Sequence, residues 1–357
     1  MTEILLRELS NVDLDWMVTA GQQKQLAAGD RLTVHESHDD PGSTPCLYIL
    51  LDGELGIISP DAIAPSGQLI QGEILGGEAL LDLPTPPSIL QATAPSTAIA
   101  IPLQKLSSKL QDDTGFAARF YRALALILSE QLRRRYKQPA TLRYGHQRET
   151  LQEALLVLGE LRDSDIDWLT TTGHVRTIAP DDFLLQAGRP VDALHLILEG
   201  TFAVLWQDGD VNPLKVCFDC PIETAGKMQQ ITTLTKGEMA GTGAFLDFRP
   251  LSVTIRAQEE ALVLSIPRQA VSARLQQDTG FSARFHRVLA IQLAKLLQAV
   301  TGMEAIANDE DGASAGTSLA MNQEAEAMDE ELDLNALQQA SQGAARFNWM
   351  LQRLGVS

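Results

Sequence analysis

Cysteine is scarce in this sequence of 357 residues, with only Cys46, Cys217 and Cys220 present, and three thiols cannot form a disulfide framework for a chain of this length. Basic side chains are also few, since 28 lysines and arginines face 46 aspartates and glutamates, for a formal net charge of −18. Nonspecific nucleic-acid binding needs an excess of cations to displace counterions. We therefore expect a reducing, cytoplasmic environment and no nucleic-acid partner.

Long apolar runs are missing as well. A membrane-spanning helix needs about 18 or more apolar residues in a row, whereas the richest run, Ala123–Leu128, ends after six. The N-terminus has neither the basic region nor the apolar stretch of a signal peptide. The sequence thus predicts a chain that does not span a membrane, although docking on a membrane complex is still open to it. Aromatic residues are 5% and apolar residues 45% of the chain, so its core must be mainly Leu, Ile, Val and Ala.

Motifs for catalysis and metal binding do not occur either. Without a nucleophile motif, a glycine-rich phosphate loop or a paired acid and base, we expect no enzymatic activity, no metal site and no cofactor. The histidines show no ligand spacing, and His195 falls in a strand pattern as a packing residue. Cys217 and Cys220 have the spacing of a redox pair or of half a zinc site, but a structural zinc needs four ligands. We expect two ordinary thiols in an inserted loop, with a reversible disulfide as the alternative.

The chain contains the same unit twice, and a repeat decides the architecture before any local pattern does. Three blocks of the first unit recur in the second. They are Leu9–Gly21 with Leu161–Gly173, Leu47–Ser59 with Leu194–Trp206, and Gly72–Arg122 with Gly237–Arg287. The last pair keeps a constant shift of 165 residues and contains LQDDTGFAARFYR against LQQDTGFSARFHR. Each unit spans about 130 residues, the usual size of one domain.

Within each unit the pattern predicts a helix, then strands, then helices. An acidic helix around Leu9–Val18 leads into short runs of Val, Ile, Leu and Tyr that are bounded by Gly and Asp, as strands are. Many short strands of this kind indicate a sandwich or barrel. After Pro102 the period changes, and Asp113 and Asp278 fit the N-caps of two amphipathic helices. The fold class is therefore mainly β with flanking α.

These patterns divide the chain into five parts. They are a first domain at 1–140, a basic linker at 141–150, a second domain at 151–302, an acidic linker at 303–332 and an amphipathic helix at 333–357. Basic residues begin before the basic linker and continue through it; they are Arg133, Arg134, Arg135, Lys137, Arg143 and Arg148. The helix dipole favours cations at a helix C-terminus, which explains the first four. The alternative is a docking patch between the domains for an anionic segment.

The C-terminal segment carries a helical apolar stripe about 20 residues long. Its members recur at spacings of 3 and 4; they are Leu337, Ala340, Ala344, Phe347, Leu351 and Leu354. The preceding acidic stretch has the composition of a disordered linker. Two interpretations stand. The helix folds back on the chain's own domains, or it docks in a groove of a partner protein.

Several motifs carry a resemblance to a known family. They are LSNVDLDWM, the strand turns LYILLDGELGI and LHLILEGTFAV, the Gly-Glu dipeptides at 72–73 and 237–238, and the Phe-Arg-Pro tripeptide at 248–250. In both units they resemble the cyclic-nucleotide-binding domain of catabolite regulators and kinase regulatory subunits. The resemblance implies two tandem cyclic-nucleotide-binding-like β jelly rolls, each with N-terminal and C-terminal helices. A tandem without a DNA-reading helix-turn-helix also resembles a cyanobacterial set of proteins associated with bacteriocin-type transport.

The resemblance implies a ligand pocket in each unit, and in the first unit it looks degenerate. In the family, a Glu near the start of a short helix takes the ribose 2′-hydroxyl, and an Arg further on pairs with the phosphate. The stretch Gly76, Gly77 and Glu78 opens the matching segment, where Gly77 falls at the Glu position and Pro86 at the Arg position. Glu78 is one residue away and would point elsewhere on a helix. No Lys or Arg occurs between positions 74 and 104.

The second unit departs from the family in the same way. Its matching positions are Gly241, Thr242, Gly243, Arg249, Leu251 and Arg256. Thr242 falls at the Glu position and Leu251 at the Arg position, with one arginine on either side of the latter. A charge-assisted contact contributes about 1.5–3 kcal/mol net, and about 1.4 kcal/mol is a tenfold change in affinity. Loss of both contacts moves micromolar binding to millimolar.

Together these features predict a non-catalytic scaffold or accessory protein with two degenerate pockets. It would contact a protein partner through the C-terminal residues Leu337, Phe347, Leu351 and Leu354, in a bacteriocin-type membrane transport complex or another assembly. A homodimer through the C-terminal helices of the domains is a further interpretation. One alternative is a sensor of a cyclic nucleotide or another small ligand that acts through the second unit. The other is a thiol-linked regulator that acts through the two neighbouring cysteines of the inserted loop.

Overall fold

The computed structural model describes residues 2–33, 45–58, 67–83, 89–137, 158–207, 228–301 and 334–356. The elements of the first unit are α1 (Thr2–Glu8), α2 (Asn11–Ala20), β1 (Gln22–Leu26), β2 (Arg31–Thr33), β3 (Cys46–Asp52), β4 (Glu54–Ile58), β5 (Gly67–Ile70), β6 (Ile74–Leu75), the 3₁₀ helix η1 (Glu78–Leu81), β7 (Ile89–Ala92), β8 (Ser96–Pro102), α3 (Leu103–Asp112) and α4 (Thr114–Tyr136). Those of the second unit are α6 (Asp163–Thr172), β9 (His174–Ile178), β10 (Phe183–Leu185), β11 (Ala193–Glu199), β12 (Phe202–Gln207), β13 (Met228–Leu234), β14 (Met239–Ala240), α8 (Thr242–Asp247), β15 (Thr254–Ala257), β16 (Ala261–Pro267), α9 (Arg268–Gln277) and α10 (Thr279–Thr301). The chain ends with α11 (Leu334–Leu354).

In the part of each unit that the structure describes, the strands form two antiparallel sheets of four, which confirms the predicted fold class. The orders are β1-β8-β3-β6 and β2-β7-β4-β5 in the first unit, and β9-β16-β11-β14 and β10-β15-β12-β13 in the second. Equivalent strands therefore have equivalent neighbours. The registers agree as well, since Tyr48 pairs with Ala100 as His195 pairs with Ser265. With their flanking helices the sheets form two jelly rolls.

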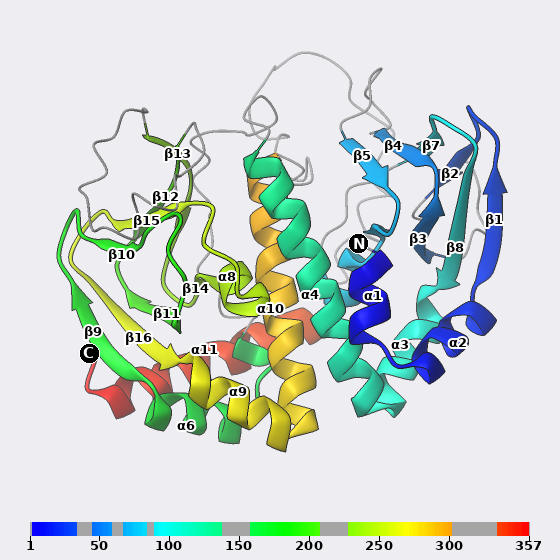
Figure 1. Cartoon of the computed structure of the whole chain (residues 1–357). Coiled ribbons are helices and arrows are strands. Elements are labelled where there is room, and N and C mark those ends of the chain that lie inside the picture. Colours follow the sequence, from blue (N-terminus) through cyan, green and yellow to red (C-terminus); the bar gives the residue numbers. More distant parts are fainter. Residues whose placement is uncertain are drawn as a thin grey trace, which may run out of the picture.

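The two rolls meet along α4 and α10, which lie side by side between them (Figure 1). Besides its own roll and α10, α4 also contacts α8 of the second roll. One hydrophobic cluster consequently runs through both rolls, from Leu9 and Phe116 to Phe281 and Val300. The homodimer interpretation relied on these same helices, and the structure pairs them with each other inside one chain.

The repeated DTGF(A/S)ARF motif caps α4 in the first roll and α10 in the second. Asp113 accepts a hydrogen bond from the Phe116 amide at 2.8 Å, and Asp278 accepts one from the Phe281 amide at 2.8 Å. Both predicted N-caps are thus confirmed. The same aspartates pair with a cation four residues earlier, at 2.8 Å in the first roll and 3.0 Å in the second.

The motif also ties α4 to α2 in the first roll and α10 to α6 in the second. Arg119 donates to Asp13 of α2 through Nε at 2.7 Å and Nη2 at 2.9 Å, and Arg284 donates to Asp165 of α6 at 2.7 and 3.1 Å. Burial raises the pKa of Asp13, but hydrogen bonds from Arg119 and Ser10 outweigh that effect and lower it to about 2. The motif that the two units share most closely is therefore structural.

The entry helix of the first roll differs in extent from the sequence prediction. The helix expected around Leu9–Val18 is α2, which begins behind the N-cap Ser10. Ser10 and Asp13 form a capping box, so two amides that the helix leaves unpaired gain partners. A further helix, α1, precedes it and was not expected from the sequence.

The residues predicted to dock on a partner lie on α11, which packs on α6 of the second roll. Phe347 and Leu351 are buried there, and Leu354 is partly buried. The side chain of Leu337 lies outside the described residues. The stripe is thus folded back on the chain's own domain, and a partner could bind it only after α11 is released.

Several predictions fall on residues that the structure does not describe. They concern the basic linker at 141–150 with Arg143 and Arg148, the thiols of Cys217 and Cys220, and the acidic linker at 303–332. The boundaries placed at 140, 151 and 302 lie in the same gaps. These assignments stay predictions.

Candidate functional site

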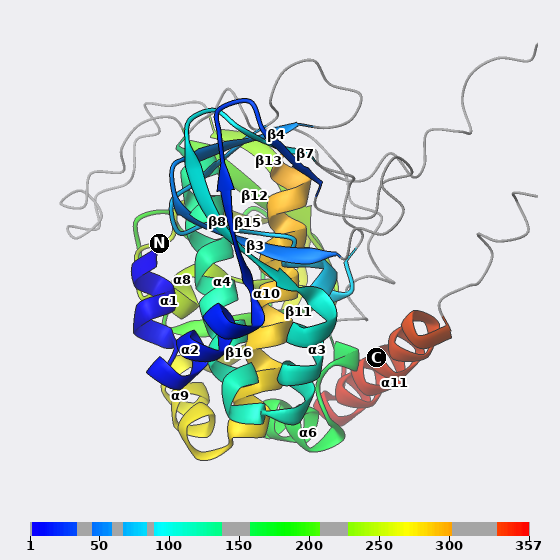
Figure 2. The same cartoon turned by 90° about the vertical axis from the view of Figure 1, so that its right-hand side faces the viewer.

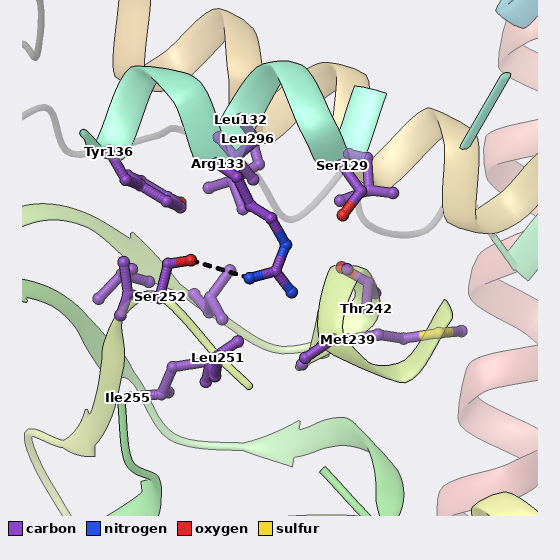
Figure 3. Close-up of a pocket in the computed structure, with 17 residues that line it drawn as sticks. Ser129, Leu132, Arg133, Tyr136, Met239, Thr242, Leu251, Ser252, Ile255 and Leu296 are labelled. Atoms are coloured by element: carbon purple, nitrogen blue, oxygen red, sulfur yellow. Dashed lines mark hydrogen bonds between the residues drawn. The ribbon is translucent and has the colours of Figure 1, made fainter. Parts of the chain in front are cut away.

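The predicted pocket of the second roll is a cavity between that roll and α4 of the first (Figure 3). The second roll contributes the start of α8 and the segment at 251–255. The first roll contributes Ser129, Leu132, Arg133 and Tyr136, all from α4. The stretch singled out from the sequence does line a cavity, but another unit of the same chain closes it.

Of the pocket positions predicted in the second roll, those that line the cavity carry no charge. Gly241 has a φ of +85°, a left-handed conformation that suits glycine, and turns the chain from β14 into α8. Thr242, Gly243 and Leu251 line the cavity. The assignment of Thr242 and Leu251 to the family's Glu and Arg positions stays a prediction.

Arg133 of α4 reaches across to the last residue of α8 and to the loop that follows it. It forms a bidentate ion pair with Asp247, with Nε–Oδ2 at 2.8 Å and Nη2–Oδ1 at 3.0 Å. Its Nη1 also donates to the Pro250 carbonyl at 2.7 Å and to the Ser252 hydroxyl at 3.0 Å, the latter drawn as a dashed line in Figure 3. Both charged side chains are largely buried. Paired, bidentate hydrogen bonds of this kind fix geometry as well as add energy, so α4 is held in place over the pocket.

Two more contacts bring α4 close to the second roll. A Cβ on Gly243 would lie 2.7 Å from Ser129 Oγ, so a glycine is what allows α8 and α4 to approach this closely. Trp206 of β12 donates from Nε1 to the Tyr136 carbonyl at 2.7 Å. The cavity that remains measures about 50 Å³, room for a few water molecules. Ligand sites are roughly 300–1,000 Å³, so a cyclic nucleotide does not fit this arrangement.

The two arginines that the sequence offered as pocket cations are engaged elsewhere. Arg249 is half exposed and bridges Asp247 and Glu130 of α4. Arg256 lies in β15, 3.7 Å from Asp181. Neither lines the cavity. Sequence reasoning missed Arg133 as a pocket residue, and its one signal was the basic stretch at the end of α4.

The corresponding site of the first roll is also packed against α4. Gly76 has a φ of +84° and leads into η1. A Cβ on Gly77 would lie 3.2 Å from Leu124 of α4, so an acid at this position would meet an apolar side chain. Pro86 and the side chain of Glu78 lie outside the described residues. Their predicted roles stay untested.

The Gly-Glu dipeptides close turns in both rolls. Glu73 accepts a hydrogen bond from the Ile70 amide, and Glu238 accepts one from the Thr235 amide, each at 2.7 Å. Glu73 is buried and also pairs with Arg134 of α4. These acids therefore serve the fold, and neither is presented to the cavity.

Two histidines are buried away from the pocket. His195 Nδ1 lies 2.9 Å from Ser265 Oγ, in the packing position expected from the sequence. Burial, together with the positive charges of Arg176 and Arg122, lowers the pKa of His195 and of His286 to about 4. Within the described ranges, no group of three or more His, Cys, Asp and Glu side chains is arranged to hold a metal ion. Among the helices described, none combines the length and apolar character needed to cross a membrane.

Comparison with known families assigns the second roll. Residues 175–278 match the family model described as cyclic nucleotide-binding domain. The match runs from β9 to the N-cap of α10 and so covers both sheets and α8. The similarity to the cyclic nucleotide-binding domain therefore lies in the second roll, in the part of it that contains the cavity-lining residues of α8.

Solved structures of similar proteins include regulatory and catabolite-responsive proteins. The regulatory domain of Toxoplasma gondii PKA with cAMP is 16% identical, over 79% of this chain and 90% of that one, with a TM-score of 0.30. A cyclic nucleotide-binding domain from Methylobacillus flagellatus is 20% identical, over 42% and 79%, with a TM-score of 0.33. The catabolite activator protein of Thermus thermophilus is 17% identical, over 40% and 59%, with a TM-score of 0.32. No curated protein sequence matches this chain. None of these similarities points to bacteriocin transport.

Proposed function

We propose that this chain is a non-catalytic regulatory or accessory protein that acts in the cytoplasm through protein contacts and not through a bound nucleotide. Cyclic nucleotide-binding domains are typically regulatory modules. The observation that carries the proposal is the contact of Arg133, which lines the pocket, with Asp247 and with the pocket residue Ser252. A domain closed by its own neighbour is suited to hold two rolls in one fixed orientation, as a scaffold does.

The test is calorimetric titration of the full chain with cyclic AMP, cyclic GMP and cyclic di-GMP. We expect no heat of binding and no shift in melting temperature at ligand concentrations up to about 1 mM. Any binding would then be weaker than a Kd of about 1 mM, which corresponds to a binding free energy of roughly −4 kcal/mol. Saturable binding of any of the three at micromolar concentration would overturn the proposal.

The narrower proposal is that the partner belongs to a bacteriocin-type transport complex. It is supported by the tandem arrangement and by the absence of a helix-turn-helix from the repeated sequence pattern. Affinity purification of the full chain from its native cells should recover components of such a transporter. Recovery of another assembly would reject the narrower proposal and leave the accessory role in place.

A sensor role for the second roll is the alternative, and the family match at 175–278 favours it. Ligand entry would require Arg133 to leave Asp247, because the closed cavity is too small. Arg133→Ala should then create measurable cyclic-nucleotide binding if the pocket is a gated sensor. If the pocket is degenerate, the variant stays without binding, because Thr242 and Leu251 still supply no charge. Arg249→Ala, at the exposed partner of the same aspartate, is the matched control.

A further inference from the structure

The internal repeat presents one surface twice, and the two copies are covered differently. In the second roll, α11 lies on α6. In the first roll, α1 and α2 form the equivalent surface, on the side of the molecule away from α11 (Figure 2). No described element takes the place of α11 there. We call the residues Leu6, Leu14 and Val18 the entry face; their counterparts at a shift of 152 are Leu158, Ile166 and Thr170.

Two of the three entry-face residues are exposed where their counterparts are buried, and the third, Leu14, is partly buried. Leu6 is 61% exposed and Leu158 is 0% exposed. Val18 is 64% exposed, whereas Thr170 is 5% exposed. The exposed residues of the first roll are thus at least as apolar as their buried counterparts in the second, although contact with solvent would favour polar residues at exposed positions.

The covered copy shows what kind of element fits this surface. α11 buries Phe347 and Met350 against the second roll. At one end Arg346 donates to the Gly159 carbonyl at 2.8 Å and to Asp163 at 2.7 Å. The occupant is therefore an amphipathic helix whose apolar stripe is flanked by charges, a common mode of recognition between helices and grooves.

Charge decides which helix fits the uncovered copy. At the end of α11 near Arg346, the acid Asp163 is replaced by Asn11, and Gly159 is replaced by Arg7, an exposed cation that pairs with the neighbouring Glu8 at 2.8 Å. A helix with an arginine there would meet a like charge, which disfavours α11 of a second copy of this chain.

At the other end the acid is kept. Arg353 of α11 pairs with Asp167 at 3.1 Å, and the counterpart of Asp167 is Asp15. The complementary helix therefore carries an acid opposite Arg7 and a cation opposite Asp15.

We propose that the entry face is a docking site for an amphipathic helix of a partner protein, with an apolar stripe, an acid opposite Arg7 and a cation opposite Asp15. The site goes beyond the proposed function, and it stands whether or not the second pocket binds a nucleotide.

The probe is a fluorescent peptide of residues 334–357 that carries the change Arg346→Glu, titrated against the full chain by fluorescence anisotropy. We expect saturable binding at least tenfold tighter than that of the unchanged peptide. Equal binding of the two peptides, or no binding of the changed peptide at about 1 mM, would overturn the proposal.

Matched variants of the full chain locate the site. Val18→Asp should abolish binding, whereas Val12→Asp should leave it unchanged, because Val12 is on the same helix and 76% exposed, but its counterpart Ser164 is exposed despite α11. Asp15→Lys should weaken binding about tenfold, and a probe that also carries Arg353→Glu should restore it. Equal effects of the two valine variants, or loss without rescue, would reject the assignment to this face.

Discussion

Replacing Arg133 tests the contact that closes the second pocket. Arg133→Met keeps most of the side-chain volume but removes the bidentate pair with Asp247 and the hydrogen bonds to Pro250 and Ser252. Breaking a buried ion pair by removing one partner costs about 3–5 kcal/mol. Asp247 keeps hydrogen bonds from the amide and Nε of Arg249, so we expect the low end, about 3 kcal/mol.

The control is Arg249→Met, which removes the exposed partner of the same aspartate. Half-exposed pairs of this kind contribute about 0–1 kcal/mol, so this variant should lose less than about 1 kcal/mol of stability. In a double-mutant cycle, Arg133→Met with Asp247→Asn should cost about 1–2 kcal/mol less than the sum of the single changes, because the two side chains share one interaction.

Urea denaturation followed by tryptophan fluorescence measures these differences, since Trp206 lies at the same junction. The first transition is compared if the rolls unfold in steps, because a single free energy is then not defined for the whole chain. Equal losses for Arg133→Met and Arg249→Met, or strict additivity in the cycle, would refute the assignment of Arg133 as the residue that holds α4 over the pocket.

Further predictions concern acid stability, the close approach of the helices, and the caps. Burial holds the pKa of His195 and His286 at about 4, against 6.5 in the unfolded chain. The free energy of unfolding should therefore be unaffected by these groups well above pH 6.5 and fall as the pH drops toward 4, by about 2 kcal/mol per histidine at pH 5. Urea denaturation that shows no loss between pH 7 and pH 5 would contradict this prediction. Gly243→Ala should destabilise the chain by about 1–3 kcal/mol and Ser129→Ala should relieve most of that loss, which thermal melts of the single and double variants measure. Asp113→Ala should cost about 1 kcal/mol through loss of its N-cap, a prediction that fails if its melting temperature equals that of the unchanged chain.

Sequence reasoning captured the features that depend on neighbouring residues. The N-caps were predictable because Asp113 and the amide it binds are three residues apart. The repeat fixed the fold class, since two copies of one pattern must build two copies of one domain. The residues Thr242 and Leu251 at the predicted pocket positions could also be read from the sequence alone, and the loss of ligand binding inferred from them stays a prediction.

The contacts between distant segments could not be predicted in this way. Arg133 and Asp247 are 114 residues apart and belong to different units, so no local period links them. In addition, the dipole of α4 already explained why a cation such as Arg133 occurs near the C-terminal end of the helix, so the sequence offered no reason to look for a distant partner. The apolar stripe of α11 was visible in the sequence, but the surface that α11 covers was not. Its position on α6 involves acids of that helix, and in the sequence these acids look like ordinary solvent-facing residues.

Cross-linking α4 to α8 tests most directly whether the chain closes its own second pocket. The Cβ atom of Ser129 lies 3.6 Å from a Cβ built on Gly243, within the range of about 3.5–4.5 Å that a disulfide spans. In a chain whose native cysteines are changed to serine, Ser129→Cys with Gly243→Cys should therefore form a disulfide rapidly and almost completely under mild oxidation. Glu130→Cys with Gly243→Cys, turned by about 100° on the same helix, should not. Cyclic AMP at 1 mM should leave the rate unchanged; failure of the first pair to link, or protection of it by the nucleotide, would contradict the closed pocket.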